Sequence, residues 1–567
     1  MSRSRWASAL VILALITIVY LPVRNAGFVW DDLLNFQQMP WLRVGDQWKQ
    51  IIFRGYNDWT YYFRPLVIAF FTLQIRLFND APGPMHLVSL GWHLVNTCLV
   101  GLLAYRLRQA YGCKDSRVTR WIIPALRMLF FGLHPALVEG VVWVGCQFEL
   151  ALTLFTLLGL LANMGITSPF WRAATVGLLF FLAALSKESA VCFPLLLLCQ
   201  DVLLSRDNGS PLSDRIKAFA QGNGLTYIMC LVAGMAYLAV RQWALGHVNP
   251  LATVGVEPLA NIQQACYLYL RYWGLAILPT GLNPLHPALP FVPGHLTPLT
   301  ALIDVASVVA IVVSLVATIR RRSPWAIAAL AFSVAIMPAL HLGTINFDDS
   351  TYHERYAMLA IASLAIFAPV AIGDWATRLS PRAITLSAIA CATWLIASTL
   401  TTISVIPLWS SNVRLWEWAL AVNPHSEVAK NMLLIAYDNE DRTGEARRLV
   451  AAIMADATPC DKCMPNIANF ALDHGDLTLA ALALDKAQGS RQITYDRRMY
   501  HAYVFGRARW LLASGQRDES RDLLQAAIES DPVDPQPYAL LGELLRSEGK
   551  IDESNRYLQK SRELTLK

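Results

Sequence analysis

Ionisable side chains stand beside apolar segments at several separate points of this chain. Asp31 and Asp32 follow the first apolar run, and Arg64 precedes another one. The remaining groups of this kind are His134 with Glu139, then Glu149, Lys187 with Glu188, Asp348 with Asp349, and His353 with Glu354 and Arg355. Charged groups are costly at the depth of a membrane, so such side chains are candidate functional residues.

The acidic pair suits proton transfer. Either Asp31 or Asp32 could take a proton from an acceptor hydroxyl, while the other carboxylate orients it or holds a metal ion. The arginines and Lys187 could bind a phosphate and stabilise it as it leaves. A phosphate leaves without a strong general acid, and in-line attack from the opposite face would invert the anomeric centre of a sugar. The set therefore suits sugar transfer from a lipid-linked phosphate at a membrane surface.

Each of these residues also has a structural interpretation. Asp31 and Asp32 could cap a helix in a solvated loop, and Arg64 could extend its charged end from the membrane to water. Helix capping or internal ion pairing would equally account for His134, Glu139, Glu149, Lys187, Glu188, Glu354 and Arg355. The sequence leaves both interpretations open, because the distinction depends on where the helices place these side chains.

The composition divides the chain into two regions. Of its 567 residues, 55% are hydrophobic and 16% are charged, and the apolar residues concentrate in blocks up to Leu408. A helix of about 20 apolar residues crosses a bilayer, so residues 1–408 are predicted to form a membrane domain. Residues 409–567 are polar and alanine-rich, as expected of a soluble domain. The first apolar run is predicted to be an uncleaved helix, the alternative being a signal peptide.

Eleven membrane spans are predicted from the apolar blocks. They cover residues 7–22, 84–105, 121–137, 148–164, 172–186, 189–204, 223–242, 300–319, 325–342, 356–373 and 384–408. Lys and Arg concentrate in cytoplasmic loops. With the N-terminus inside, four basic clusters satisfy this rule, at 106–120, 206–217, 320–322 and 378–382. The candidate residues and the C-terminal domain then lie on the non-cytoplasmic face.

Two further apolar stretches do not fit this count. Residues 66–78 are too short to cross and are predicted to lie in the outer interface, within a first outer loop over 23–83. Residues 260–279 hold Arg271 among aromatic residues and are predicted to be interfacial or re-entrant. The predicted fold class is all-α, a polytopic membrane helix bundle followed by a helical-repeat domain.

The C-terminal region repeats itself 34 residues later. Ala508, Leu511, Gly515, Ser520, Leu524 and Ala527 recur as Gly542, Leu545, Gly549, Ser554, Leu558 and Ser561. Small residues at these sites let two antiparallel helices pack closely, and glycine permits the turn between them. Weaker copies lie around Gly475 and over 437–446. The spacing is typical of tetratricopeptide repeats, which bind partner proteins; a rigid spacer or dimerisation module is the alternative.

Cys460 and Cys463 are the one closely spaced pair among the ten cysteines. In an oxidising compartment they could form a disulfide, and free thiols are the alternative. The local sequence does not provide two more ligands for zinc. The other cysteines fall in or beside apolar spans, where cysteine behaves as a small hydrophobic residue.

Several pieces of the chain resemble the GT-C superfamily of membrane glycosyltransferases, most closely the transmembrane and tetratricopeptide-repeat O-mannosyltransferases. In chain order they are Phe28-Val29-Trp30-Asp31-Asp32, Phe63-Arg64-Pro65-Leu66, His93-Leu94-Val95-Asn96, His134-Pro135 through Glu139 and Trp143, Leu185-Ser186-Lys187-Glu188, and Glu354-Arg355-Tyr356. The chain departs from the family pattern at Gln147-Phe148-Glu149 and at Ala357-Met358.

The resemblance implies an inverting enzyme that moves a hexose, with mannose expected, from a polyprenyl-phosphate donor to a protein Ser or Thr hydroxyl. Asp31 or Asp32 would be the catalytic base, and Arg64, Lys187 and Arg355 would contact the donor phosphate. The substrate-site candidates are His134, Glu139, Glu149, Glu188, His353 and Glu354. No cofactor and no resident metal are expected, although the acidic pair could hold Mn²⁺ or Mg²⁺.

The predicted partners are the lipid donor, the bilayer and an acceptor protein recruited by the repeats, with no nucleic acid. The membrane would be the bacterial inner membrane with a periplasmic repeat domain, or the endoplasmic reticulum with a lumenal one. Three other functions stay open at this point. They are a glycosyltransferase acting on a cell-envelope glycan or lipid, a non-catalytic scaffold that uses the repeats, and a transporter. A transporter would place polar residues in both halves of the bilayer.

Overall fold

The structure is a computed structural model that describes residues 3–38, 62–113, 119–205, 212–246, 257–287, 289–342, 350, 352–376, 378–456, 458, 460–490, 493, 497–532 and 534–565. Over these residues the chain is helical or irregular and contains no strand, so the predicted all-α class is confirmed. The chain divides into two compact units, Met1–Ser411 and Asn412–Lys567. The division falls where the composition changes from apolar to polar.

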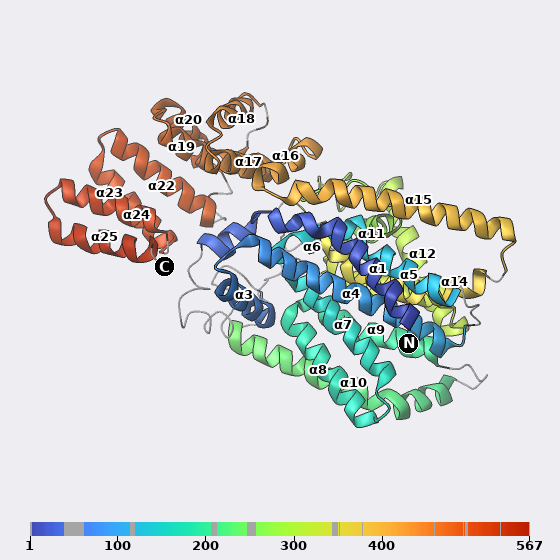
Figure 1. Ribbon diagram of the computed structural model, residues 1–567. Helices are drawn as coiled ribbons and strands as arrows, with labels where there is room; N and C mark the ends of the chain where they lie inside the picture. Colours follow the sequence, from blue (N-terminus) through green and yellow to red (C-terminus); the bar gives the residue numbers. More distant parts are fainter. Residues whose placement is uncertain are drawn as a thin grey trace. The chain divides into compact units, whose positions relative to one another are not determined.

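Figure 1 labels the helices of the first unit except α13. The earlier ones are α1 (Arg3–Tyr20), α3 (Pro65–Phe78), α4 (Pro82–Tyr111), α5 (Thr119–Gly132), α6 (Val138–Val142), α7 (Gln147–Gly165), α8 (Pro169–Ser186) and α9 (Phe193–Leu204). The later ones are α10 (Leu212–Leu245), α11 (Pro258–Ile277), α12 (Pro298–Arg321), α13 (Pro324–Ile336), α14 (Met358–Ala376) and α15 (Pro381–Val405). Helices α7, α8 and α10 lie side by side.

Proline begins half of these helices, at Pro65, Pro82, Pro169, Pro258, Pro298, Pro324 and Pro381. Proline suits the first helical position because its ring fixes φ near the helical value and the missing N–H has no helical acceptor there. Short 3₁₀ turns make the tight connections between several helices. They include η1 (Leu21–Asn25), η4 (Pro135–Leu137), η5 (Val144–Cys146), η6 (Glu188–Cys192), η7 (Met337–Leu340), η8 (Glu354–Ala357) and η9 (Ile406–Trp409).

Eight helical segments among the described residues are long and apolar enough to cross a membrane. They are Ala7–Asn25, Pro82–Tyr111, Val144–Gly165, Pro169–Ser186, Lys217–Leu245, Pro298–Arg321, Glu354–Ile372 and Pro381–Trp409. The pair Ile122–Gly132 and Pro135–Val142, bent by 49°, would be a ninth. These segments indicate a multi-pass membrane protein, and the count of eleven spans stays a prediction.

The remaining predicted segments form shorter or less apolar helices. The predicted span 189–204 contains α9, which has only 12 residues because η6 takes the start of the segment. The span 325–342 becomes α13 and η7, a shorter apolar helix. Helix α3 has 14 residues, and α11 is not among the helices that could cross. Both therefore remain compatible with the predicted interfacial or re-entrant placement.

Polar side chains on α4 hold the neighbouring connections in place. His86 Nε2 lies 3.1 Å from the Gly27 carbonyl oxygen, and His93 Nε2 lies 3.0 Å from that of Gly132. Asn96 donates to the Leu150 carbonyl at 3.0 Å. All three side chains are fully buried. Each contact fixes the start or end of a segment that carries a candidate residue.

An apolar cluster seats the segment that follows the first span. Phe28 and Phe36 pack with Val67 and Phe71 of α3 and with Val144 of η5. Burial of such side chains contributes about 1.5–3 kcal/mol each. The cluster therefore fixes the acidic pair, which lies between the two phenylalanines in sequence, against η5.

The second unit consists of paired helices (Figure 1). They are α16 (Asn412–Val422), α17 (Glu427–Asn439), α18 (Thr443–Ala455), α19 (Met464–Asp473), α20 (Leu477–Gln488), α22 (Arg497–Ala513), α23 (Arg517–Ser530), α24 (Pro535–Ser547) and α25 (Ile551–Thr565). Gly475, Gly515 and Gly549 each adopt a positive φ, between 75° and 85°, in the turn between two paired helices. These are the turn glycines that the repeat predicts.

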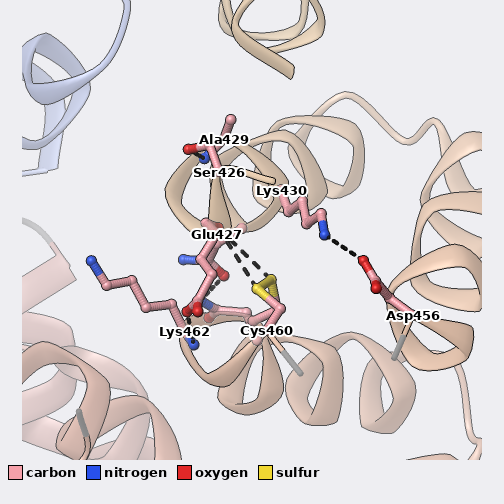
Figure 2. Close-up of a disulfide and its surroundings, with 10 residues drawn as sticks. Ser426, Glu427, Ala429, Lys430, Asp456, Cys460 and Lys462 are labelled. Atoms are coloured by element: carbon pink, nitrogen blue, oxygen red, sulfur yellow. Dashed lines mark hydrogen bonds and ion pairs between the residues drawn. A yellow bond between two sulfur atoms is a disulfide. The ribbon is translucent and has the colours of Figure 1, made fainter. Parts of the chain in front are cut away.

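Cys460 and Cys463 form a disulfide in this unit (Figure 2). Both sulfur atoms lie 3.8 Å from the Glu427 carbonyl oxygen at the start of α17, and the Glu427 carboxylate accepts from the Lys462 N–H at 3.2 Å. The turn before α19 is thereby attached to α17. The eight other cysteines are thiols that form no disulfide, and all belong to the first unit.

Gly542→Ala should destabilise the last helix pair by about 1–3 kcal/mol, the usual cost of overpacking. A Cβ at this position would lie 2.8 Å from Leu558 Cγ and 3.2 Å from the Leu558 nitrogen. Gly444→Ala is the matched control, since nothing lies within 4 Å of its added Cβ, and its effect should stay within about 1 kcal/mol. Hydrogen exchange over α24 and α25 in the full chain measures the difference. Equal exchange in the two variants would contradict the close packing.

Candidate active site

The two adjacent aspartates occupy different environments. The Asp32 side chain is fully buried, and its Oδ1 accepts from the Gly145 N–H of η5 at 2.8 Å. Burial raises the pKa of the Asp32 carboxyl well above its ordinary value, and the nearby charge of Asp31 acts in the same direction. Asp31 is exposed, while Asp32 attaches its helical turn to η5.

Two stacked indoles lie next to the acidic pair. Trp30 and Trp143 are nearly parallel, with ring centroids 4.9 Å apart and an interplanar angle of 7°. Trp143 and Asp32 both lie next to Gly145, since a Cβ on that glycine would be 3.2 Å from Trp143 Nε1 and 3.0 Å from Asp32 Oδ1. The Trp143 ring also lies 5.0 Å from Arg355 Cζ. The Trp143 indole is thus near both the predicted acidic pair and a cation of the predicted phosphate site.

Arg355 is held by Glu139. The guanidinium forms an ion pair with Glu139 of α6, and the Arg355 backbone N–H donates to the same carboxylate at 2.9 Å. The Glu139 side chain is 3% exposed, and His353 Nδ1 lies 3.8 Å from its Oε1. A buried ion pair of this kind needs good geometry to offset the loss of water. The structure therefore joins α6 to η8 through three predicted site residues.

Lys187 forms a second buried pair, with Glu149 at the start of α7. Their side chains are 9% and 7% exposed. The Lys187 Nζ lies 4.4 Å from the centroid of the Tyr356 ring, and Arg355 Cζ lies 4.7 Å from the same centroid. Cations are attracted to the faces of aromatic rings, so Tyr356 links the Lys187 pair to the Arg355 pair.

Glu188 binds two arginines. Its carboxylate lies 2.9 Å from Arg64 Nε and 3.3 Å from Arg241 Nη1. Burial works against ionisation, but the two guanidinium groups lower the pKa of Glu188 below its ordinary value. Arg64 also lies over the rings of Tyr62 and Phe148, at 4.2 and 5.0 Å. Lys187 and Glu188 are adjacent in the chain, so the Glu188 group is joined to the two pairs described above. We call the three groups together the ion-pair network.

Arg241 was not predicted from the sequence. It lies near the end of α10, and its side chain is only 9% exposed. The signal was present, since an arginine at the end of a long apolar helix is itself a functional candidate. Its partner Glu188 is 53 residues away, so the sequence did not show what it contacts.

Two of the predicted site residues, His134 and Glu354, contact side chains and backbone groups other than the ion pairs described above. The ring nitrogens of His134 lie 3.2 Å from the Ala276 carbonyl oxygen and 3.3 Å from the Ala136 nitrogen, and its ring contacts Phe130 and Trp394. Within the described part of the chain these partners include no predicted site residue. His134 therefore closes the end of α11, as the capping interpretation allows.

Glu354 points away from Arg355, its neighbour in the chain. Its Oε1 accepts from the Asn283 N–H at 3.0 Å and lies 2.7 Å from His286 Nε2. Tyr272 of α11 donates to the adjacent His353 carbonyl at 3.1 Å. These contacts fix η8 from the side opposite the network. Asp348 and Asp349 lie outside the described residues.

A further, half-buried acid has other partners. The Asp201 carboxylate of α9 accepts from Asn163 of α7 and from the Tyr227 hydroxyl of α10, both at 2.8 Å. Two donors on two neighbouring helices account for a structural cross-link. Over the described residues, no group of three or more His, Cys, Asp or Glu side chains is arranged to hold a metal ion. The predicted option of a divalent ion at Asp31 and Asp32 stays untested.

No protein-family model matches the chain, and no curated protein matches it either. The predicted membership of the GT-C superfamily therefore stays a prediction.

Lys187→Met alone should cost about 3–5 kcal/mol of stability, because it leaves the Glu149 carboxylate buried without its cation. Replacing both partners, in Lys187→Met with Glu149→Met, should restore most of the loss, because apolar side chains of similar volume avoid the desolvation cost. Thermal unfolding of the purified proteins measures both effects. If the double variant is as unstable as the single one, the two side chains do not form a direct pair.

Proposed function

We propose that the protein is an inverting glycosyltransferase. It moves a hexose from a polyprenyl-phosphate donor to a Ser or Thr hydroxyl of an acceptor protein, at the non-cytoplasmic face of its membrane. Tetratricopeptide-like repeats in the second unit recruit the acceptor. The observation that carries the proposal is the convergence of four cations from four separate elements on one group of glutamates and aromatic rings. They are Arg64, Arg241, Lys187 and Arg355.

The cations suit a donor with a phosphate head and a lipid tail. The tail would stay in the bilayer, and the phosphate would meet Lys187 and Arg355 at the edge of the helix bundle. Glutamates already fix the positions of these cations, so little reorganisation is needed when a phosphate oxygen replaces a carboxylate oxygen as partner. Donors that are held in place before the reaction stabilise developing charge most effectively.

The reaction proceeds in one displacement. The acceptor hydroxyl oxygen attacks the anomeric carbon from the face opposite the phosphate, and its proton passes to a carboxylate. The bond from the anomeric carbon to the phosphate oxygen breaks, and polyprenyl phosphate leaves with the electron pair. The cations stabilise the negative charge on the leaving phosphate. The configuration of the anomeric carbon is inverted.

The two aspartates have separate roles in this proposal. Asp31 is exposed and is the base that takes the acceptor proton. Asp32 accepts from the Gly145 N–H and so positions the segment that carries both aspartates. Because its carboxyl is buried, the protonated form of Asp32 is favoured. Pairs of carboxylates in different environments commonly divide their roles in this way.

The disulfide of the second unit supports its placement outside the cytoplasm. Structural disulfides persist in oxidising compartments and are rare in the cytosol. Eleven spans with the N-terminus inside would carry the second unit to that side, the periplasm of a bacterium or the lumen of the endoplasmic reticulum. Close packing at Gly542 and the turn glycines fit a tetratricopeptide array.

Asp31→Asn should lower transfer by about 10²–10⁴-fold, the usual contribution of a general base. Asp32→Asn should keep most of the activity, because the amide oxygen can still accept from the Gly145 N–H. Labelled polyprenyl-phosphate hexoses and an acceptor peptide rich in Ser and Thr measure the rate. Full activity in Asp31→Asn would refute its role as base, and a wild-type protein that neither binds nor turns over any donor would favour the scaffold.

The pH dependence of stability tests the buried state of Asp32. Its pKa in the folded protein is raised above the unfolded value, so the stabilising effect is complete at low pH and is lost as pH rises through the folded-state pKa. Asp32→Asn cannot ionise and should lack this loss. The melting temperature of the wild type should therefore fall relative to the variant as pH increases. Parallel curves would contradict the burial of the carboxyl.

Quantitative thiol labelling tests the compartment of the second unit. In rapidly quenched and denatured protein, eight of the ten cysteines should react, and all ten after reduction. The control with both Cys460→Ser and Cys463→Ser should give eight in each case. Ten reactive thiols without reduction would place the unit in a reducing compartment and contradict the proposed topology.

A further inference from the structure

Trp30 has an unusual backbone for a large residue. Its φ is +56°, in the left-handed region that favours glycine. A bulky side chain rarely adopts this conformation, and such strain persists only where the surrounding structure imposes it. The surrounding structure therefore imposes this backbone conformation on the indole that directly precedes the acidic pair.

The conformation places the indole flat against Trp143. The two rings are within 7° of parallel. Trp143 is itself in contact with Arg355 and with Trp409, whose ring centroid is 6.1 Å away. Gly145 leaves no spare room, since a Cβ there would lie 3.0 Å from Asp32 Oδ1 and 3.2 Å from Trp143 Nε1. The Trp30 indole therefore rests on a rigid support.

The indole pair also lies near both the acidic pair and one of the cations. In a displacement with inversion, the anomeric carbon is situated between the base and the leaving phosphate. Here Trp143 lies next to Gly145 together with Asp32 of the acidic pair, and its ring lies 5.0 Å from Arg355 Cζ. Trp30 is half-buried, so its indole is partly accessible beside Asp31. His353 is close as well, with its ring 6.2 Å from that of Trp30.

We infer that the hexose of the donor packs on the Trp30 indole, and that the ring face stabilises positive charge at the anomeric carbon. This inference rests on the proposed glycosyl transfer. As the bond to the phosphate oxygen breaks, the sugar acquires oxocarbenium character, and an indole is the aromatic group that attracts a cation most strongly. The cations recognise the phosphate, and Trp30 recognises the sugar.

A substitution series at position 30 tests this role. Trp30→Leu keeps an apolar side chain and removes the aromatic face, so kcat should fall about 30-fold, the size of a desolvated cation–π interaction. Trp30→Phe should lose about 3-fold. The KM for the donor, and inhibition by sugar-free polyprenyl phosphate, should change less than 3-fold, because the lost interaction belongs to the transition state. Trp171→Leu replaces an indole of α8 that is 64% exposed and is the matched control.

Fluorinated tryptophans introduced at position 30 alone separate the charge effect from folding. They preserve the shape of the indole and weaken its attraction for cations, so kcat should fall stepwise with the number of fluorine atoms while the melting temperature stays constant. An unchanged kcat across this series, with an active wild-type protein, would overturn the role of Trp30. A wild-type protein that does not turn over any polyprenyl-phosphate hexose would instead overturn the glycosyl transfer on which the inference rests.

Discussion

A charge at the edge of an apolar helix bundle must have a partner, and the rest of the first unit depends on this constraint. An unpaired buried ion costs several kcal/mol, whereas a pair with good geometry offsets that cost. The pair of Arg355 and Glu139 joins η8 to α6, and that of Lys187 and Glu149 joins the end of α8 to α7. The pairs therefore fix the register of helices whose apolar surfaces alone would allow them to slide.

In the proposed reaction, the same pairs would prepare the site for an anion. A cation that is already held needs little movement to exchange a carboxylate oxygen for a phosphate oxygen, and preorganised charge of this kind is the main source of catalysis in many enzymes. Aromatic rings accompany these cations, since Tyr356 lies close to both Lys187 and Arg355, and Trp143 lies close to Arg355. In this proposal, the ion pairs that stabilise the fold also supply the phosphate site. The dual role accounts for the near balance between the charges of the cations and those of the glutamates.

The sequence predicted the helical class and most of the residues that form the ion pairs, because both leave local signals. Apolar blocks mark helices, and charges beside those blocks stand out. The orientation of each side chain leaves no such signal. Glu354 and Arg355 are neighbours in a 3₁₀ turn yet face opposite sides, and His134 caps α11 through Ala276, 142 residues further along the chain. The role of Arg241 was missed because its partner Glu188 is 53 residues away in the chain. The length of α9 was overestimated because a tight turn and a helix have the same composition.

A structure of the protein with a bound polyprenyl-phosphate hexose tests the central claim most directly, namely that the glutamate-held cations form a phosphate site. The account predicts phosphate oxygens within hydrogen-bonding distance of Lys187 Nζ and the Arg355 guanidinium, with the sugar between them and Asp31. A phosphate bound elsewhere, with the pairs to Glu149 and Glu139 unchanged, would contradict it.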